Sequence, residues 1–294
     1  MKMMNKQLMM LAFGLAIALA STAQTGMDNA NAALSKKNKD TLSGWITGGT
    51  FSFTFSEAAS NTYYYQVKGG QKSALGVKAI VDYSFDKHST SSIWYNSIRA
   101  RYGAATSVDA SGNNVFLKND DYLNYTSILA KPINEKWAYA GFFSFESQFQ
   151  DYFLTPGYFK LGPAMMFTPS PHFSLTMSPI MANFNTKLAS GLRDTTLYDV
   201  PAGKTTSFGA GAFAQAKLNY DIGKGVNYKS VLTVSNDYFH TPGSVVFDWT
   251  NLFTFVVNKY IGATVSANLR YNDFEIKHMQ FQQGLGIGLN YKLK

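Results

Sequence analysis

The sequence predicts an all-β fold: a transmembrane, antiparallel, up-and-down β-barrel of about 12 strands that follows a cleaved N-terminal signal peptide. Three observations predict it. Apolar and polar residues alternate in consecutive segments, the connections between these segments are alternately short and long, and charged residues supply only 15% of the chain. Ordinary soluble domains carry about 25% charged residues. A barrel that exposes its outer surface to lipid needs fewer.

The composition also excludes other classes of protein. Aromatic residues supply 15% of the 294 residues, yet the mean hydropathy is slightly negative, so the apolar residues are dispersed. A bundle of membrane helices is excluded, because each helix needs about 20 consecutive apolar residues. The chain has no cysteine, which excludes disulfides, thiolate metal sites and a lipidated N-terminal cysteine. The formal net charge of +8 is modest.

The one continuous apolar run lies near the N-terminus. Two lysines precede residues 8–20, and Ser21 and Ala23 then fit the small-residue positions of a signal-peptidase site. The run is too short to span a membrane. We therefore expect residues 1–23 to be a cleaved signal peptide, with an uncleaved anchor as the alternative.

A polar stretch rich in Asn and Lys follows over residues 24–43. It has no periodicity, which predicts a flexible periplasmic lead. The periodic part begins at Gly44, so we expect the outer-membrane barrel to occupy residues 44–294. Phe51, Phe53 and Phe55 alternate there with Ser and Thr, which is the period of a strand whose two faces meet different environments.

The second segment alternates apolar residues from Leu75 to Phe85, and no helix would place them on one face. The same criterion gives strands over residues 44–56, 75–85, 92–103, 121–130, 136–149, 157–168, 172–183, 206–220, 226–236, 244–257, 261–272 and 280–293. An even number of antiparallel strands lets the sheet close and pair every backbone group in lipid. A soluble β-sandwich is the alternative, because its short alternating strands give an overlapping pattern.

The connection lengths favour the barrel. The expected short turns cover residues 86–91, 131–135, 169–171, 221–225 and 258–260. The expected longer loops cover residues 57–72, 104–119, 150–156, 184–205, 237–243 and 273–279. Short turns at one end and long loops at the other are typical of outer-membrane barrels with their termini in the periplasm.

Tryptophans supply a second check. Trp45, Trp94 and Trp137 each stand at the start of a strand that runs upward from the periplasm. An indole ring is favoured at a membrane interface because its N–H can reach water or headgroups. We expect these three residues to form a periplasmic aromatic girdle. Residues expected in an outer girdle are Tyr102, Phe149, Phe247 and Tyr271.

Short motifs carry a resemblance to a known family. They are Trp45-x-x-Gly48-Gly49, Ser92-x-Trp94-x-Asn96, Phe145-x-x-Gln148-Phe149 and the ending Asn290-Tyr291-Lys292. With these motifs the chain resembles an uncharacterised family of Bacteroidota outer-membrane β-barrel proteins, known as a domain of unknown function. The resemblance implies an outer-membrane barrel without an established activity, and it implies no functional residues.

Charged residues on the strand face opposite the apolar one predict a charge network in the lumen. Its expected members are Arg99, Arg101, Glu146, Lys160, Asp248 and Arg270. The basic excess fits either an ion-paired plug or the wall of an anion-favouring pore. The plug is favoured, because Arg and Glu groups buried at low dielectric must find partners.

Catalysis is disfavoured. The histidines are His88, His172, His240 and His278. A surface hydrolase of the protease or phospholipase type needs a serine, a histidine and an orienting polar residue together, and no G-x-S-x-G motif is present. We expect no catalytic residue, no metal site and no cofactor.

The expected function is therefore that of an integral outer-membrane barrel acting as a structural or accessory component of an envelope assembly. A small-solute, anion-favouring channel is the first alternative and a surface hydrolase the second. The expected partners are outer-membrane lipid and other envelope proteins. Nucleic acid is not expected, because the basic residues are scattered singly and the signal peptide directs the chain out of the cytoplasm.

Overall fold

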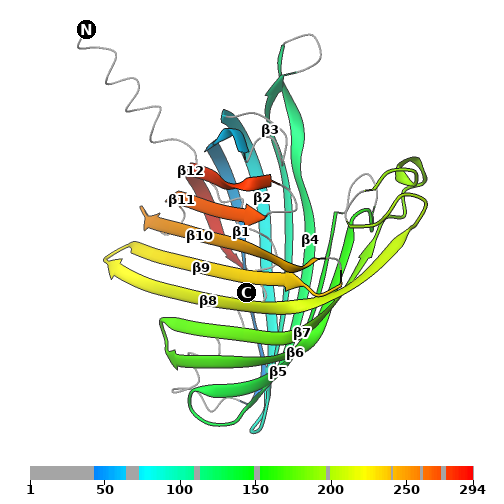
Figure 1. Cartoon of the computed structure of the whole chain (residues 1–294). Coiled ribbons are helices and arrows are strands. Elements are labelled where there is room, and N and C mark those ends of the chain that lie inside the picture. Colours follow the sequence, from blue (N-terminus) through cyan, green and yellow to red (C-terminus); the bar gives the residue numbers. More distant parts are fainter. Residues whose placement is uncertain are drawn as a thin grey trace.

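The structure is a computed structural model that describes residues 43–63, 73–108, 113–148, 153–196, 199–239, 241–258, 261–272 and 276–293. These residues form twelve antiparallel strands that close into one barrel (Figure 1). The predicted fold class, an all-β up-and-down barrel, is confirmed. The expected signal peptide (1–23) and all but the last residue of the expected lead (24–43) lie outside the described residues.

Each strand is hydrogen-bonded to its neighbours in the sequence, and β1 also pairs with β12. The strands are β1 (Gly44–Ser60), β2 (Ser73–His88), β3 (Ile93–Val108), β4 (Asn114–Pro132), β5 (Trp137–Ser147), β6 (Gly157–Ser170), β7 (Phe173–Thr186), β8 (Thr206–Gly223), β9 (Val226–Asp237), β10 (Thr241–Val256), β11 (Ile261–Asn272) and β12 (Ile276–Leu293). One short 3-10 helix, η2 (Ser190–Leu192), lies between β7 and β8. No helix in the described part of the chain is long and apolar enough to cross a membrane.

The barrel closes where β1 pairs with β12, and these two strands approach each other closely. β1 and β12 pair from Gly49 opposite Leu293 to Ser60 opposite Gln282. Gly288 lies opposite Thr54, and a Cβ at Gly288 would come within 2.6 Å of the Thr54 methyl carbon. A glycine at this position therefore lets the two strands pack without displacing the Thr54 side chain.

Side chains alternate between the two faces of the sheet, as the sequence period requires. On β5, Ala138, Ala140 and Phe142 are buried, whereas Tyr139 and Gly141 are exposed. Large exposed apolar side chains share the outward face around the ring, among them Phe51, Leu129, Leu161, Phe208, Val265 and Leu289. An apolar exterior around a largely polar interior is the arrangement of a transmembrane barrel.

The strands extend further than the sequence pattern predicts at the end away from the short turns, here called the loop end. The expected loop 104–119 is wrong: pairing continues between Ala104 and Lys118, and the β3–β4 hairpin rises beyond its neighbours (Figure 1). The expected loops 237–243 and 273–279 are also shorter, because β10 begins at Thr241 and β12 at Ile276. Backbone pairing continues where the apolar alternation that marks lipid contact has ended.

The other end, here called the turn end, matches the prediction more closely. The connections there join β2 to β3, β4 to β5, β6 to β7, β8 to β9 and β10 to β11, and all are short. The first residue of β1 and the last of β12 also lie at this end.

Candidate functional site in the barrel lumen

Strand register places a set of charged side chains on the inward face. The basic members are Lys78, Arg99, Arg101, Lys160, Lys217, Lys229 and Arg270. The acidic members are Asp82, Asp86, Glu146 and Asp248. Basic side chains thus outnumber acidic ones on the described inward face.

Arg99 and Asp82 form the most direct ion pair. They are cross-strand partners on β3 and β2. Arg99 donates from Nη2 to Asp82 Oδ2 over 2.7 Å and from Nε to Asp82 Oδ1, which makes the pair bidentate. The sequence prediction included Arg99 but missed Asp82. The signal was available, because Asp82 alternates with the outward-facing Val81 and Tyr83.

A second group lies beside this pair. The Arg101 guanidinium carbon lies 4.3 Å from the centroid of the Tyr122 ring, its cross-strand neighbour on β4. The Tyr122 hydroxyl donates to Glu146 Oε2 over 3.3 Å. Lys160 follows on β6, opposite Ser144 and Asn183. Four of the six expected network residues therefore lie on β3, β5 and β6.

The other two expected residues lie across the barrel. Asp248 and Arg270 are cross-strand partners on β10 and β11, with 4.0 Å between Asp248 Oδ2 and Arg270 Nη1. They belong to a row of inward side chains in which each residue lies opposite the next. This row runs Thr176, Gln215, Thr233, Asp248, Arg270 and Gln280.

An apolar cluster lines the inward face towards the turn end, and the sequence did not predict it. Its residues, here called the lumen cluster, are Ile93, Tyr95, Ile128, Ala130, Ala138, Ala140, Phe142, Ala164, Met166, Met181 and Phe213. They lie on β3 to β8 and are 0% to 9% exposed. Ile128 and Phe142 follow the inward phase of β4 and β5, but the next outward residues, Leu129 and Phe143, are also apolar. Alternation is therefore weak there.

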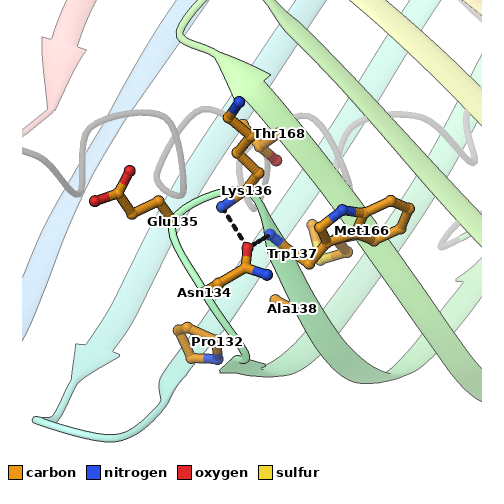
Figure 2. Close-up of a pocket in the computed structure, with 8 residues that line it drawn as sticks. All are labelled: Pro132, Asn134, Glu135, Lys136, Trp137, Ala138, Met166 and Thr168. Atoms are coloured by element: carbon orange, nitrogen blue, oxygen red, sulfur yellow. Dashed lines mark hydrogen bonds between the residues drawn. The ribbon is translucent and has the colours of Figure 1, made fainter.

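A small cavity lies next to this cluster, at the β4–β5 turn (Figure 2). Asn134 Oδ1 accepts the backbone N–H groups of Lys136 and Trp137, each over 2.9 Å. The cavity of about 20 Å³ also touches Met166 and Thr168. It has room for about one water molecule and is too small for a solute.

A buried lysine organises the connection between β7 and β8 at the loop end. Lys187 is 0% exposed, and its Nζ donates to the carbonyl oxygens of Arg193 (3.3 Å), Thr195 and Pro201 (3.4 Å). Thr155 Oγ1, from the neighbouring connection, accepts the N–H of Leu188 over 2.7 Å. The loop is thus folded around one ammonium group.

The three tryptophans expected in the girdle lie at the turn end of their strands. Trp45 and Trp94 are in contact, with ring centroids 6.0 Å apart. Trp137 packs on Phe167, with centroids 4.6 Å apart. The Lys87 ammonium lies 5.7 Å from the Trp45 ring centroid.

The described histidines lie on different hairpins. His88 ends β2, His172 lies in the β6–β7 turn, and His278 stacks on Tyr63 with centroids 4.2 Å apart. His240 lies outside the described residues. Among the residues that the structure describes, no group of three or more His, Asp or Glu could hold a metal ion.

Comparison with known sequences gives one family match. Residues 55–153 match the model of a family described as "Protein of unknown function (DUF3078)". This range runs from β1 to the connection after β5. No curated protein sequence matches the chain.

Solved structures with a similar fold are outer-membrane barrels of low sequence identity. The NanC porin is 8% identical and has a TM-score of 0.44, with 81% of this chain and 98% of that chain covered. An outer membrane channel from Pseudomonas putida F1 is 10% identical, with a TM-score of 0.46 and coverages of 86% and 97%. The translocator domain of the autotransporter NalP from Neisseria meningitidis is 8% identical, with a TM-score of 0.42 and coverages of 91% and 95%.

Proposed function

We propose that the protein is an integral outer-membrane barrel with a closed lumen, and that it acts as a structural or accessory component of the envelope. The observation that carries this proposal is the lumen cluster. Its side chains face inward, on the side of the sheet that lines a pore in an open channel, and yet they are buried and apolar.

Apolar side chains on a pore wall oppose a continuous column of water, and hydrophobic constrictions close channels by dewetting. Phe142 and Met166 are the bulkiest side chains of β5 and β6 in this zone. Above them, towards the loop end, Arg99 forms an ion pair with Asp82, and the Arg101 guanidinium packs on the Tyr122 ring. The lumen thus combines an apolar zone with an ion-paired zone.

The test is conductance of the purified full-length barrel in planar bilayers. We expect conductance near zero for the unmodified protein, with heat-modifiable gel mobility as the control that the barrel is folded. Steady single-channel conductance in that protein would contradict the proposal.

The basic excess of the inward face favours one second candidate, a small-solute channel that prefers anions. For this candidate the bilayers conduct chloride in preference to potassium, and replacing Arg99 and Arg270 with serine weakens that preference. The two candidates differ in the first measurement, since only the channel conducts without a mutation.

An accessory role also requires partners in the envelope. Isolation of the tagged protein from outer membranes, followed by identification of co-purifying proteins, tests it: an accessory component brings others with it, whereas a channel is isolated alone or as a homo-oligomer. The cleaved signal peptide over residues 1–23 and the origin in Bacteroidota stay predictions. Amino-terminal sequencing of the mature protein tests the first.

A further inference from the structure

Two sets of four outward-facing side chains share one hydrogen-bonding pattern. The first set, the β3–β4 tetrad, consists of Trp94 and Asn96 on β3 and Tyr125 and Ser127 on β4. The Trp94 indole N–H donates to Ser127 Oγ over 2.8 Å, and the Tyr125 hydroxyl donates to Asn96 Oδ1 over 2.9 Å. Asn96 lies directly opposite Ser127.

The second set, the β9–β10 tetrad, consists of Tyr228 and Ser230 on β9 and Trp249 and Asn251 on β10. The Trp249 indole N–H donates to Ser230 Oγ over 2.9 Å, and the Tyr228 hydroxyl donates to Asn251 Oδ1 over 2.7 Å. Asn251 lies directly opposite Ser230. Each bond of the first tetrad therefore has its counterpart in the second.

The tryptophans of the two tetrads lie at different distances from the turn end of the barrel. In the closed ring of twelve strands, β9 and β10 lie opposite β3 and β4. Trp94 is the second residue of β3, directly at the turn end. Trp249 is followed by seven more residues of β10, and this strand ends with Val256 at the turn end. Trp249 thus lies much further from the turn end than Trp94.

Beyond Asn251, the outward residues of β10 on the way to the turn end are Phe253 and Phe255, and both are apolar. Phe255 and Val257 are exposed on that surface. Seven residues of a tilted strand correspond to about 17 Å along the membrane normal, compared with an apolar band of about 25 Å. Hydrocarbon that covers Phe255 and Val257 must also surround Trp249.

An indole N–H in hydrocarbon is costly when it has no partner, which is why tryptophans collect at the interfaces. Ser230 removes that cost for Trp249. The serine hydroxyl in turn donates to Asn251 Oδ1 over 3.0 Å, and the Tyr228 hydroxyl donates to the same oxygen. Trp249 is 37% exposed and therefore still presents its ring to the surroundings.

We infer that the β9–β10 tetrad seats Trp249 among the acyl chains of the bilayer, whereas the β3–β4 tetrad holds Trp94 at the interface of the turn-end leaflet. The partner of this surface is the lipid hydrocarbon. The inference rests on the membrane placement in the proposed function and is independent of whether the lumen conducts.

Depth-dependent quenching tests it. Full-length variants that keep a single tryptophan, at position 45, 94 or 249, are made by replacing the others with phenylalanine and are refolded into phosphatidylcholine vesicles. The vesicles carry bromine near the headgroup, at mid-chain or near the chain end. We expect mid-chain or chain-end bromine to quench Trp249 most, and bromine near the headgroup to quench Trp45 and Trp94 most.

The serines provide matched variants. In the protein that keeps only Trp249, Ser230→Ala removes the acceptor, so the ring should turn towards the leaflet surface. We expect the ratio of mid-chain to near-headgroup quenching to fall about twofold. Ser127→Ala in the same protein should leave the Trp249 profile unchanged, because it alters only the tetrad on the opposite side.

The possible failures are distinguishable. If Trp45 and Trp94 are quenched but Trp249 prefers the label near the headgroup, the inference is wrong while the membrane placement stands. An unchanged Trp249 profile in Ser230→Ala, with the barrel folded, overturns the role of the tetrad. If no label quenches any tryptophan, the membrane placement fails and the inference fails with it. The variant that keeps only Trp249 and retains Ser230 carries no mutation in either tetrad except Trp94→Phe. Its quenching profile therefore remains decisive if the Ser230→Ala variant does not fold.

Discussion

Asp82 and Arg99 face each other across β2 and β3 inside the barrel and are joined by two hydrogen bonds, one of them 2.7 Å between Arg99 Nη2 and Asp82 Oδ2. Their side chains are 27% and 20% exposed. The pair is thus shielded but still in reach of water. Removing one partner should therefore cost less stability than the about 3 to 5 kcal/mol that is typical of a fully buried pair.

The first prediction concerns this pair. Asp82→Ala and Arg99→Ala should each lower the free energy of unfolding by about 1 to 3 kcal/mol, because each leaves a partly buried charge without its partner. The double variant should lose less than the sum of the two. Urea unfolding in vesicles measures all three, and Lys224→Ala in an exposed turn is the control. Additive losses would show that the two residues are not coupled.

Much of the fold could be predicted from the sequence, because lipid contact imposes a period that is visible in single strands. Phe51, Phe53 and Phe55 mark β1 in this way. The outer ends of the strands could not be predicted. Beyond the membrane both faces of a hairpin meet water, so pairing such as that of Ala104 with Lys118 continues without an apolar alternation to reveal it.

The lumen could be predicted only in part. Alternation identifies which residues point inward, as for Arg99 and Arg270, but not which inward residues meet. Asp82 was missed although its phase was visible, since its pairing with Arg99 depends on the register of two strands. Phe142 lies between Gly141 and Phe143, where side-chain type does not reveal which face is outward.

The second prediction concerns the β7–β8 connection. Lys187→Met should weaken its folding, because three carbonyl oxygens lose a charged donor. The net contribution of one hydrogen bond to a charged group is about 1.5 to 3 kcal/mol of stability. We expect a broad-specificity protease to cleave the loop of the folded variant at least several times faster than that of the unmodified protein. Lys204→Met, at an exposed position of the same loop, is the control. Equal cleavage rates in the two variants would exclude a special role of Lys187.

The third prediction concerns a close approach of β8 to β9. A Cβ at Gly211 would collide with the backbone carbonyl oxygen of Asn236, whereas a Cβ at Gly141 would meet nothing within 4 Å. Gly211→Ala should therefore destabilise the barrel by about 1 to 3 kcal/mol, the usual cost of overpacking. Gly141→Ala should change little. The fraction of heat-modifiable protein after refolding in increasing urea measures both. If Gly211→Ala refolds as well as Gly141→Ala, the strands do not approach as closely as described.

The last prediction concerns the lumen cluster. Phe142 is 4% exposed and faces inward, so Phe142→Ser removes apolar volume from the zone that opposes water and adds a hydroxyl. Truncating a buried Phe costs about 3 to 5 kcal/mol, yet the closed hydrogen-bonded sheet should keep the barrel folded in vesicles. We expect the variant to conduct ions in planar bilayers when the unmodified protein does not. Phe142→Leu keeps an apolar side chain and should stay closed. Because Arg99, Arg270 and their basic neighbours line the same passage, the new conductance should prefer chloride over potassium. A folded Phe142→Ser barrel that stays as silent as Phe142→Leu would show that the cluster does not close the lumen.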